Sequence, residues 1–169
     1  GPGLDAGTEM GPLISRTHQK KVLDYIHAGH EDGAELLCGG GAYTDQRAVG
    51  NFVQPTVFIS TRPDMRIVRE EIFGPVLVVQ LFDTEEEALR LANDSIYGLA
   101  GGVFTSDASR AQRVVRGLRA GITWINCYHP TFNEAPWGGY KQSGIGRELG
   151  TYGYEAYTEV KQITHCINP

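Results

Sequence analysis

The sequence predicts an α/β fold, in which a mostly parallel sheet is flanked by helices. The first observation is that short apolar strand patterns alternate with helical patterns along most of the chain, as in βαβ units. The second is composition: 169 residues that are 41% hydrophobic and 21% charged suit one soluble domain with a real core. The third is an apolar strand pattern at residues 161–167, which has no obvious local partner and needs another sheet edge.

The individual elements follow in order. Ser15 is predicted to cap a helix over residues 17–28, where apolar residues recur at helical spacing. Thr84 is predicted to cap a second helix with three glutamates in its first turn, where the helix dipole favours anions. The other expected elements are strands at 34–38, 52–60, 76–82, 99–105 and 122–126, and a basic helix at 108–118 whose arginines face solvent. Pro55 hints that the second of these strands lies at a sheet edge.

The stretch Arg69-Glu70-Glu71-Ile72-Phe73-Gly74-Pro75-Val76 organises the rest of the chain. Gly74 permits unusual backbone angles and Pro75 fixes φ, so the stretch predicts a rigid turn that leads into a buried strand. Such a turn can hold a carboxylate and an aromatic ring in one arrangement, suited to ribose hydroxyls and to a flat ring system. The alternative is a solvated glutamate pair followed by a core phenylalanine.

Residues 127–150 have little periodicity and are rich in glycine, proline and aromatic residues. A loop of this length in a compact domain is usually functional. We therefore expect part of a binding site in this segment.

Charge and cysteine usage exclude several classes of function. A net charge of -5 argues against a nucleic-acid partner, because phosphate binding requires a basic face. No apolar run is long enough to span a membrane, and no signal-peptide pattern opens the chain. The three cysteines, Cys38, Cys127 and Cys166, are too widely spaced for a disulfide framework or a zinc site. We expect a reducing, cytoplasmic setting.

The motif Glu-Glu-Ile-Phe-Gly-Pro resembles a signature of the NAD(P)-dependent aldehyde dehydrogenases, and further stretches agree in order. They are Met10-Gly11-Pro12-Leu13-Ile14, Tyr97-Gly98-Leu99-Ala100, Trp124-Ile125-Asn126, Pro136-Trp137-Gly138-Gly139-Tyr140-Lys141-Gln142-Ser143-Gly144, Gly146-Arg147-Glu148-Leu149-Gly150 and Tyr157-Thr158-Glu159-Val160-Lys161. The residues around Trp137 look most like the betaine aldehyde branch. The resemblance implies that residues 1–150 are the C-terminal portion of the catalytic domain and residues 151–169 an oligomerisation segment.

The resemblance also implies a cofactor half-site. Glu71 is expected to hold the nicotinamide ribose hydroxyls of NAD or NADP, and Phe73 to lie against the ribose and nicotinamide. Glu70 is expected to be a solvated or helix-capping charge. The family's nucleophilic cysteine and its base lie upstream of this segment. Glu148 matches a glutamate in a proton-exit path, with an ion pair to a neighbouring basic residue as the alternative.

For the substrate, the resemblance points to Trp137, which in the betaine aldehyde branch helps to form an aromatic box around trimethylammonium. A tryptophan ring is the best face for such a cation, at roughly 0.5 to 2 kcal/mol per contact. The alternative is a tryptophan that anchors the loop. His129 is expected at the pocket mouth, or else exposed on the loop. Backbone carbonyls of Lys141 and Gly144 correspond to a potassium site between subunits.

We therefore expect this chain to be part of an NAD(P)-dependent dehydrogenase that oxidises betaine aldehyde or a related amine-bearing aldehyde. Its partners would be a small-molecule aldehyde and further copies of itself, joined as a dimer or tetramer through the C-terminal strand. Alone, the chain would be inactive because it lacks the nucleophile and the nucleotide fold. The alternatives are a stand-alone, non-catalytic assembly module derived from the family and, less favoured, a protein that only binds NAD.

Overall fold

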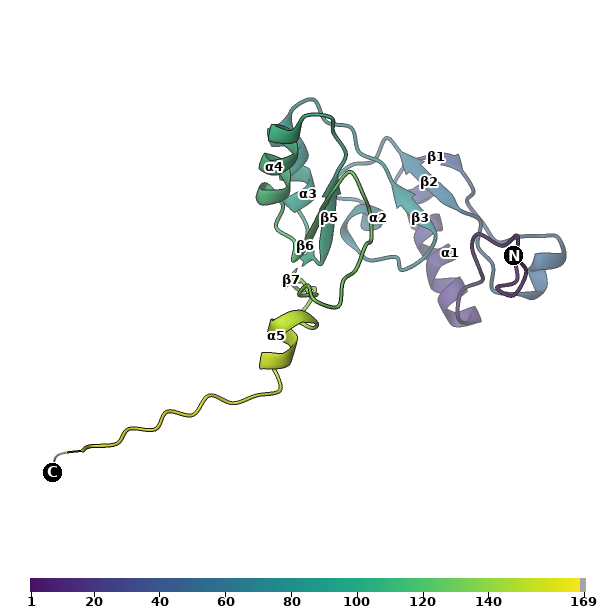
Figure 1. Ribbon diagram of the computed structural model, residues 1–169. Coiled ribbons are helices and arrows are strands. Elements are labelled where there is room, and N and C mark those ends of the chain that lie inside the picture. Colours follow the sequence, from purple (N-terminus) through teal and green to yellow (C-terminus); the bar gives the residue numbers. More distant parts are fainter. Residues whose placement is uncertain (168–169) are drawn as a thin grey trace. The chain divides into compact units, whose positions relative to one another are not determined.

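A computed structural model of the chain describes residues 1–167, which form two compact units (Figure 1). The first unit is Gly1–Phe82 and the second begins at Asp83. The predicted division of the chain at residue 150, between a catalytic portion and an oligomerisation segment, remains a prediction.

The first unit is built on a three-stranded mixed sheet in the order β1-β2-β3. Strand β1 (Glu35–Cys38) pairs antiparallel with β2 (Thr56–Ile59), which pairs in parallel with β3 (Val76–Val78). Strand β2 is therefore central, and the hint of an edge strand from Pro55 was wrong. Because β2 begins at Thr56, Pro55 stands just outside the strand and disturbs no interior ladder bond.

Helix α1 (Arg16–Glu31) supplies much of the core of this unit. Its predicted cap is confirmed: the Ser15 side chain accepts a hydrogen bond from the backbone N–H of His18 at 3.1 Å. The short helices η1 (Gln46–Val49) and α2 (Arg66–Arg69) were not predicted. One apolar cluster joins α1, the sheet and α2, and it contains Val22, Tyr25, Ile26, Ala34, Val53, Phe58, Met65, Ile67 and Ile72.

The second unit contains two small sheets. Strands β5 (Ala100–Val103) and β6 (Ile122–Ile125) pair in parallel, with Ala100 opposite Ile122. Helix α4 (Ala108–Gly117) packs on both strands, and α3 (Glu85–Asn93) packs on α4 (Figure 1). Strands β4 (Tyr97–Gly98) and β7 (Tyr140–Lys141) form an antiparallel pair, and α5 (Gly150–Glu155) follows.

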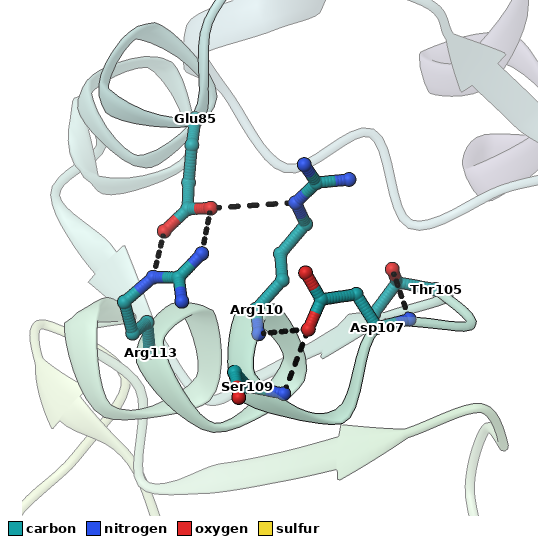
Figure 2. Close-up of polar contacts among 6 residues, drawn as sticks. All are labelled: Glu85, Thr105, Asp107, Ser109, Arg110 and Arg113. Carbon is teal, nitrogen blue, oxygen red and sulfur yellow. Dashed lines mark hydrogen bonds and ion pairs between the residues drawn. The ribbon is translucent and has the colours of Figure 1, made fainter.

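Helices α3 and α4 are joined by ion pairs that involve arginines of α4, which the sequence predicted to face solvent. Glu85 accepts two hydrogen bonds from the Arg113 guanidinium, at 2.9 and 2.8 Å, and lies 3.4 Å from Arg110 (Figure 2). The Asp107 side chain caps α4 by accepting from the backbone N–H groups of Ser109 and Arg110. The two arginines remain more than half exposed, but they are paired.

Two parts of the predicted fold differ from the structure. A mostly parallel sheet is not confirmed, because the described strands form three small sheets with both antiparallel and parallel pairs. The terminal strand expected at residues 161–167 is not confirmed, since these residues form no strand in the single chain. A strand requires a neighbouring edge to bond with, and the predicted edge belongs to another copy of the chain. None of the helices within residues 1–167 has the length and hydropathy that a membrane crossing requires.

Candidate functional site

One face of α1 carries the turn at residues 70–74. His18, Val22 and Tyr25 lie at positions i, i+4 and i+7 of the helix and therefore share a face. Tyr25 donates a 2.7 Å hydrogen bond to the Glu70 carboxylate. The ring Nε2 of His18 lies 2.6 Å from the backbone oxygen of Phe73.

Glycine at position 74 follows from this packing. A Cβ added to Gly74 would lie 2.6 Å from Cγ2 of Val22, which is fully buried in the core. Only glycine lets the turn approach α1 this closely. The predicted rigid turn is therefore held by close contact with the helix as well as by Pro75.

The adjacent glutamates, Glu70 and Glu71, differ in their hydrogen-bond partners. Glu70 accepts hydrogen bonds from Arg66 at 3.1 and 3.0 Å and from Tyr25. The hydrogen bonds from Arg66 and, to a smaller extent, from Tyr25 lower the pKa of Glu70 below its ordinary value. The same bond to Glu70 raises the pKa of Tyr25. Glu70 occupies the C-cap position of α2, so its role is to join α2 to α1.

Glu71 is exposed, and its carboxylate forms no hydrogen bond or ion pair with any residue between 1 and 167. The Phe73 side chain is 70% exposed, so the alternative of a core phenylalanine was wrong. Phe73 also has φ of 55°, in the left-handed region that non-glycine residues rarely occupy. A free carboxylate beside an exposed ring fits the hydroxyls and flat face of a nucleoside.

Four rings gather from β6 and the loop that follows it, and we call them the aromatic cluster: Trp124, Tyr128, His129 and Trp137. The Trp124 ring centroid lies 5.4 Å from that of Tyr128 and 6.5 Å from that of Trp137. His129 lies 6.3 Å from Trp137 in an edge-to-face arrangement. The structure thus brings together the two predicted substrate residues, His129 and Trp137, although His129 is exposed.

Trp124 is the fixed base of the aromatic cluster, and our sequence reasoning assigned it no role. Its side chain is 8% exposed, and its Nε1 donates a 3.2 Å hydrogen bond to the backbone oxygen of Pro130. Tyr128 was missed as well. The signal that could have found both is the short spacing of aromatic residues between β6 and the turn that follows it.

Glu148 is joined to Trp137 through the backbone. Each N–H donates to the other residue's carbonyl at 2.7 Å, which forms an isolated antiparallel bridge. The Glu148 side chain is exposed, and its carboxylate makes no ion pair within the described chain, so that alternative was wrong. The neighbouring Arg147 instead donates to the backbone oxygens of Gly139 and Gly146.

Lys141 and Gly144, the predicted potassium ligands, both have positive φ, of 52° and 131°. The Lys141 ammonium donates to the backbone oxygens of Asn93 and Ser95, each at 3.0 Å, and so ties β7 to the end of α3. Potassium binding by the two backbone carbonyls remains a prediction. The described residues contain no group of three or more His, Cys, Asp or Glu side chains that could hold a metal ion.

The three cysteines are free and exposed. Cys127 lies just after β6 and next to the aromatic cluster in sequence. Exposure alone does not make a thiol reactive, because reactivity depends on a lowered thiol pKa. None of the three is assigned a role in the site.

A sequence model of the aldehyde dehydrogenase family matches residues 1–163. The chain belongs to this family. It is 53% identical to a betaine aldehyde dehydrogenase of Bacillus subtilis over 100% of this chain and 35% of that protein. It is also 48% identical to the peroxisomal aminoaldehyde dehydrogenase 1 of Pisum sativum, over 95% of this chain and 32% of that protein. The chain thus spans about a third of the length of these relatives.

Solved structures agree with the sequence comparison. The NAD⁺ complex of an aldehyde dehydrogenase from Bacillus cereus matches with a TM-score of 0.94 and 49% identity, covering 99% of this chain and 34% of that one. A betaine aldehyde dehydrogenase from Staphylococcus aureus in complex with NAD⁺ matches with a TM-score of 0.91 and 53% identity, over 93% and 31% of the two chains. These likenesses confirm the family predicted from the motifs.

Proposed function

We propose that this chain is the C-terminal part of an NAD(P)-dependent dehydrogenase that oxidises betaine aldehyde or another amine-bearing aldehyde to the carboxylate. The aromatic cluster carries the substrate assignment. Four rings, each with its centroid within 6.5 Å of at least two others, offer several π faces, which attract a quaternary or protonated amine. Overall identity does not decide between substrates, because mitochondrial aldehyde dehydrogenases match almost as well, at 52% for that of Sus scrofa.

Glu71 and Phe73 are proposed to bind the nicotinamide riboside. The Glu71 carboxylate has all its acceptor positions free for the two ribose hydroxyls. The Phe73 ring, 70% exposed, would cover the sugar and the nicotinamide. The nicotinamide, when bound, accepts the hydride from the aldehyde carbon. The NAD⁺ complexes of the two matching structures described above favour NAD over NADP for this chain.

The remaining predicted residues act at the substrate and at its protons. Trp137 and His129 would orient the amine end of the aldehyde, so that the carbonyl end projects toward a nucleophile outside this chain. Glu148 would accept a proton released during hydrolysis, since its carboxylate is exposed and unpaired within the described residues. Potassium at the Lys141 and Gly144 carbonyls would support the loop that carries these groups.

Assembly and location complete the proposal. The extended segment after α5 exposes Tyr157, Val160 and Ile163, each at 84% or more, as an apolar surface for another copy of the chain. We propose that it pairs with a sheet edge of that copy to form a dimer or tetramer. Three free cysteines fit the reducing cytoplasm, although some relatives are named as mitochondrial or peroxisomal.

The isolated chain is proposed to be inactive, since no cysteine in it lies in the family's nucleophile motif. The alternative, a non-catalytic assembly module, draws on the exposed segment after α5. The two hypotheses differ in whether joining this chain to an upstream catalytic portion produces activity. An assembly module would form homo-oligomers as it stands and would gain no activity when joined to an upstream catalytic portion.

Substrate discrimination tests the proposal in the complete enzyme that contains this segment. Betaine aldehyde is compared with tert-butylacetaldehyde, which has the same shape but a neutral carbon in place of the quaternary nitrogen. The value of kcat/KM for the cation should exceed that for the neutral analogue by about tenfold or more, because cation–π attraction acts only on the cation. Equal values would contradict the aromatic cluster as the amine site.

A further inference from the structure

We infer that His18 is a positioning residue for the Phe73 ring, an inference that rests on the proposed function of Phe73 in cofactor binding. The ring Nε2 of His18 lies 2.6 Å from the backbone oxygen of Phe73, and the ring centroids are 5.9 Å apart. A carbonyl oxygen only accepts hydrogen bonds, so Nε2 carries the proton. No sequence motif marks His18 for a role.

Phe73 needs support that its own side chain does not provide. Its φ of 55° is unfavourable for a residue with a side chain, so surrounding contacts must hold it. The ring is 70% exposed and so has little packing to fix its direction. The His18 imidazole therefore meets Phe73 twice, once at the carbonyl and once at the ring, in a tilted arrangement.

The backbone on either side of Phe73 is fixed by other bonds. Before it, the N–H of Glu70 donates to the Arg66 carbonyl at 2.9 Å. After it, the Pro75 carbonyl accepts from the N–H of Thr56 at 2.8 Å, which joins the turn to β2. Within residues 1–167, the Phe73 carbonyl accepts no other hydrogen bond. His18 is thus the contact that sets the peptide orientation at the exposed ring.

His18 is itself well placed for this role. It lies in the first turn of α1, where its backbone N–H donates to the Ser15 cap. One turn later on the same face, Val22 contacts Gly74, so helix and turn meet at two successive points. The helix start therefore defines where the imidazole stands relative to the turn.

Two substitutions separate the hydrogen bond from the ring contact. His18→Phe keeps a ring but has no donor, whereas His18→Gln keeps an N–H donor near the position of Nε2 and loses the ring. In the complete enzyme, His18→Phe should raise KM for NAD⁺ about fivefold, the effect of one lost hydrogen bond, with kcat and the aldehyde KM within about twofold. His18→Gln should stay within about twofold of wild type.

His27→Gln is the matched control, because His27 lies on the same helix and its exposed side chain pairs, among the described residues, only with Glu31. It should leave every constant unchanged. An unchanged KM for NAD⁺ in His18→Phe, or equal effects of the phenylalanine and glutamine variants, would overturn the inference.

Crystal structures of wild type and His18→Phe give an independent readout. The variant should lose the left-handed backbone of Phe73 or rotate its ring, and an unchanged Phe73 would overturn the role of His18. If the wild-type complete enzyme reduces no NAD⁺ with any aldehyde, the proposed function has failed, and these structures still decide whether His18 positions Phe73.

Discussion

Trp137 and Glu148 are joined by two reciprocal backbone hydrogen bonds of 2.7 Å, which form an isolated antiparallel bridge outside the named strands. The family resemblance predicts a substrate role for Trp137 and a role in proton movement for Glu148. The bridge fixes the register of the two backbones, so the Trp137 and Glu148 side chains project from one hydrogen-bonded pair of residues. Gly153 of α5 packs closely on this pair, since a Cβ there would lie 2.9 Å from the Glu148 carbonyl carbon.

The first prediction concerns the Trp137 ring. In the complete enzyme, Trp137→Leu should lower the preference for betaine aldehyde over tert-butylacetaldehyde by about tenfold, because the best cation–π face is removed. Trp137→Phe should retain part of the preference. The measurement is the ratio of kcat/KM values for the two aldehydes. Tyr152→Leu, which removes an exposed aromatic outside the aromatic cluster, is the control; an equal fall there would contradict the assignment.

The second prediction separates the adjacent glutamates. Glu71→Gln should raise KM for NAD⁺ by roughly tenfold, since hydrogen bonds to a charged group contribute about 1.5–3 kcal/mol. It should leave the unfolding free energy unchanged, because its carboxylate has no partner in the described chain. Glu70→Gln should do the reverse and lower stability by less than about 1 kcal/mol, as expected for a surface pair with Arg66. NAD⁺ titration measures the first effect and denaturant unfolding the second. Equal losses of NAD⁺ binding in the two variants would contradict the assignment of Glu71 to the cofactor.

The third prediction concerns the close approach at Gly74. Gly74→Ala should destabilise the chain by about 1–3 kcal/mol, because the new methyl group would press on Val22 in the core. Gly11→Ala is the matched control, since a Cβ at Gly11 meets no atom within 4 Å. Denaturant unfolding measures both. A loss for Gly74→Ala no larger than that for Gly11→Ala would rule out the tight contact.

The fourth prediction is a pH dependence of the link between α3 and α4 (Figure 2). The Arg113 guanidinium holds the pKa of Glu85 below its ordinary value of 4.5. A carboxyl with a lowered pKa in the folded state stabilises the fold above the ordinary value, and this stability is lost as the pH falls through the folded-state pKa. Arg113→Gln should therefore cost stability at pH 7 but progressively less below 4.5.

The control for this pair is Arg116→Gln, on the same helix and without a described carboxylate partner. It should show no such convergence with wild type as the pH falls. Chemical unfolding at a series of pH values is the measurement. A cost for Arg113→Gln that stays constant down to about pH 3 would show that the pair with Glu85 does not titrate as described.

Much of the local structure was predictable because its causes are local. Ser15 and Thr84 cap their helices as expected, since a side-chain oxygen next to an apolar helical pattern is sufficient for capping. The five predicted strands are present but shorter than expected, as β3 ends at Val78 and not at residue 82, and the two-residue strands β4 and β7 were not predicted. Strand length depends on which neighbour is available for bonding, and the sequence does not show that neighbour.

The site was predictable only where a motif marked it. Glu71, Phe73 and Trp137 were identified from the family resemblance, and their free carboxylate, exposed ring and clustered ring agree with those roles. His18 and Trp124 were missed because their partners, Phe73 and the loop aromatics, come together only through folding. The terminal strand at residues 161–167 stays a prediction, because its expected partner is a sheet edge of another copy of the chain.

A hybrid enzyme tests the central claim most directly. This segment would replace the C-terminal third of the Bacillus subtilis betaine aldehyde dehydrogenase, with which it aligns over 35% of that protein's length. The hybrid should form NADH from NAD⁺ and betaine aldehyde, and the 169-residue chain alone should form none. A folded hybrid that binds NAD⁺ but oxidises no aldehyde would contradict the account.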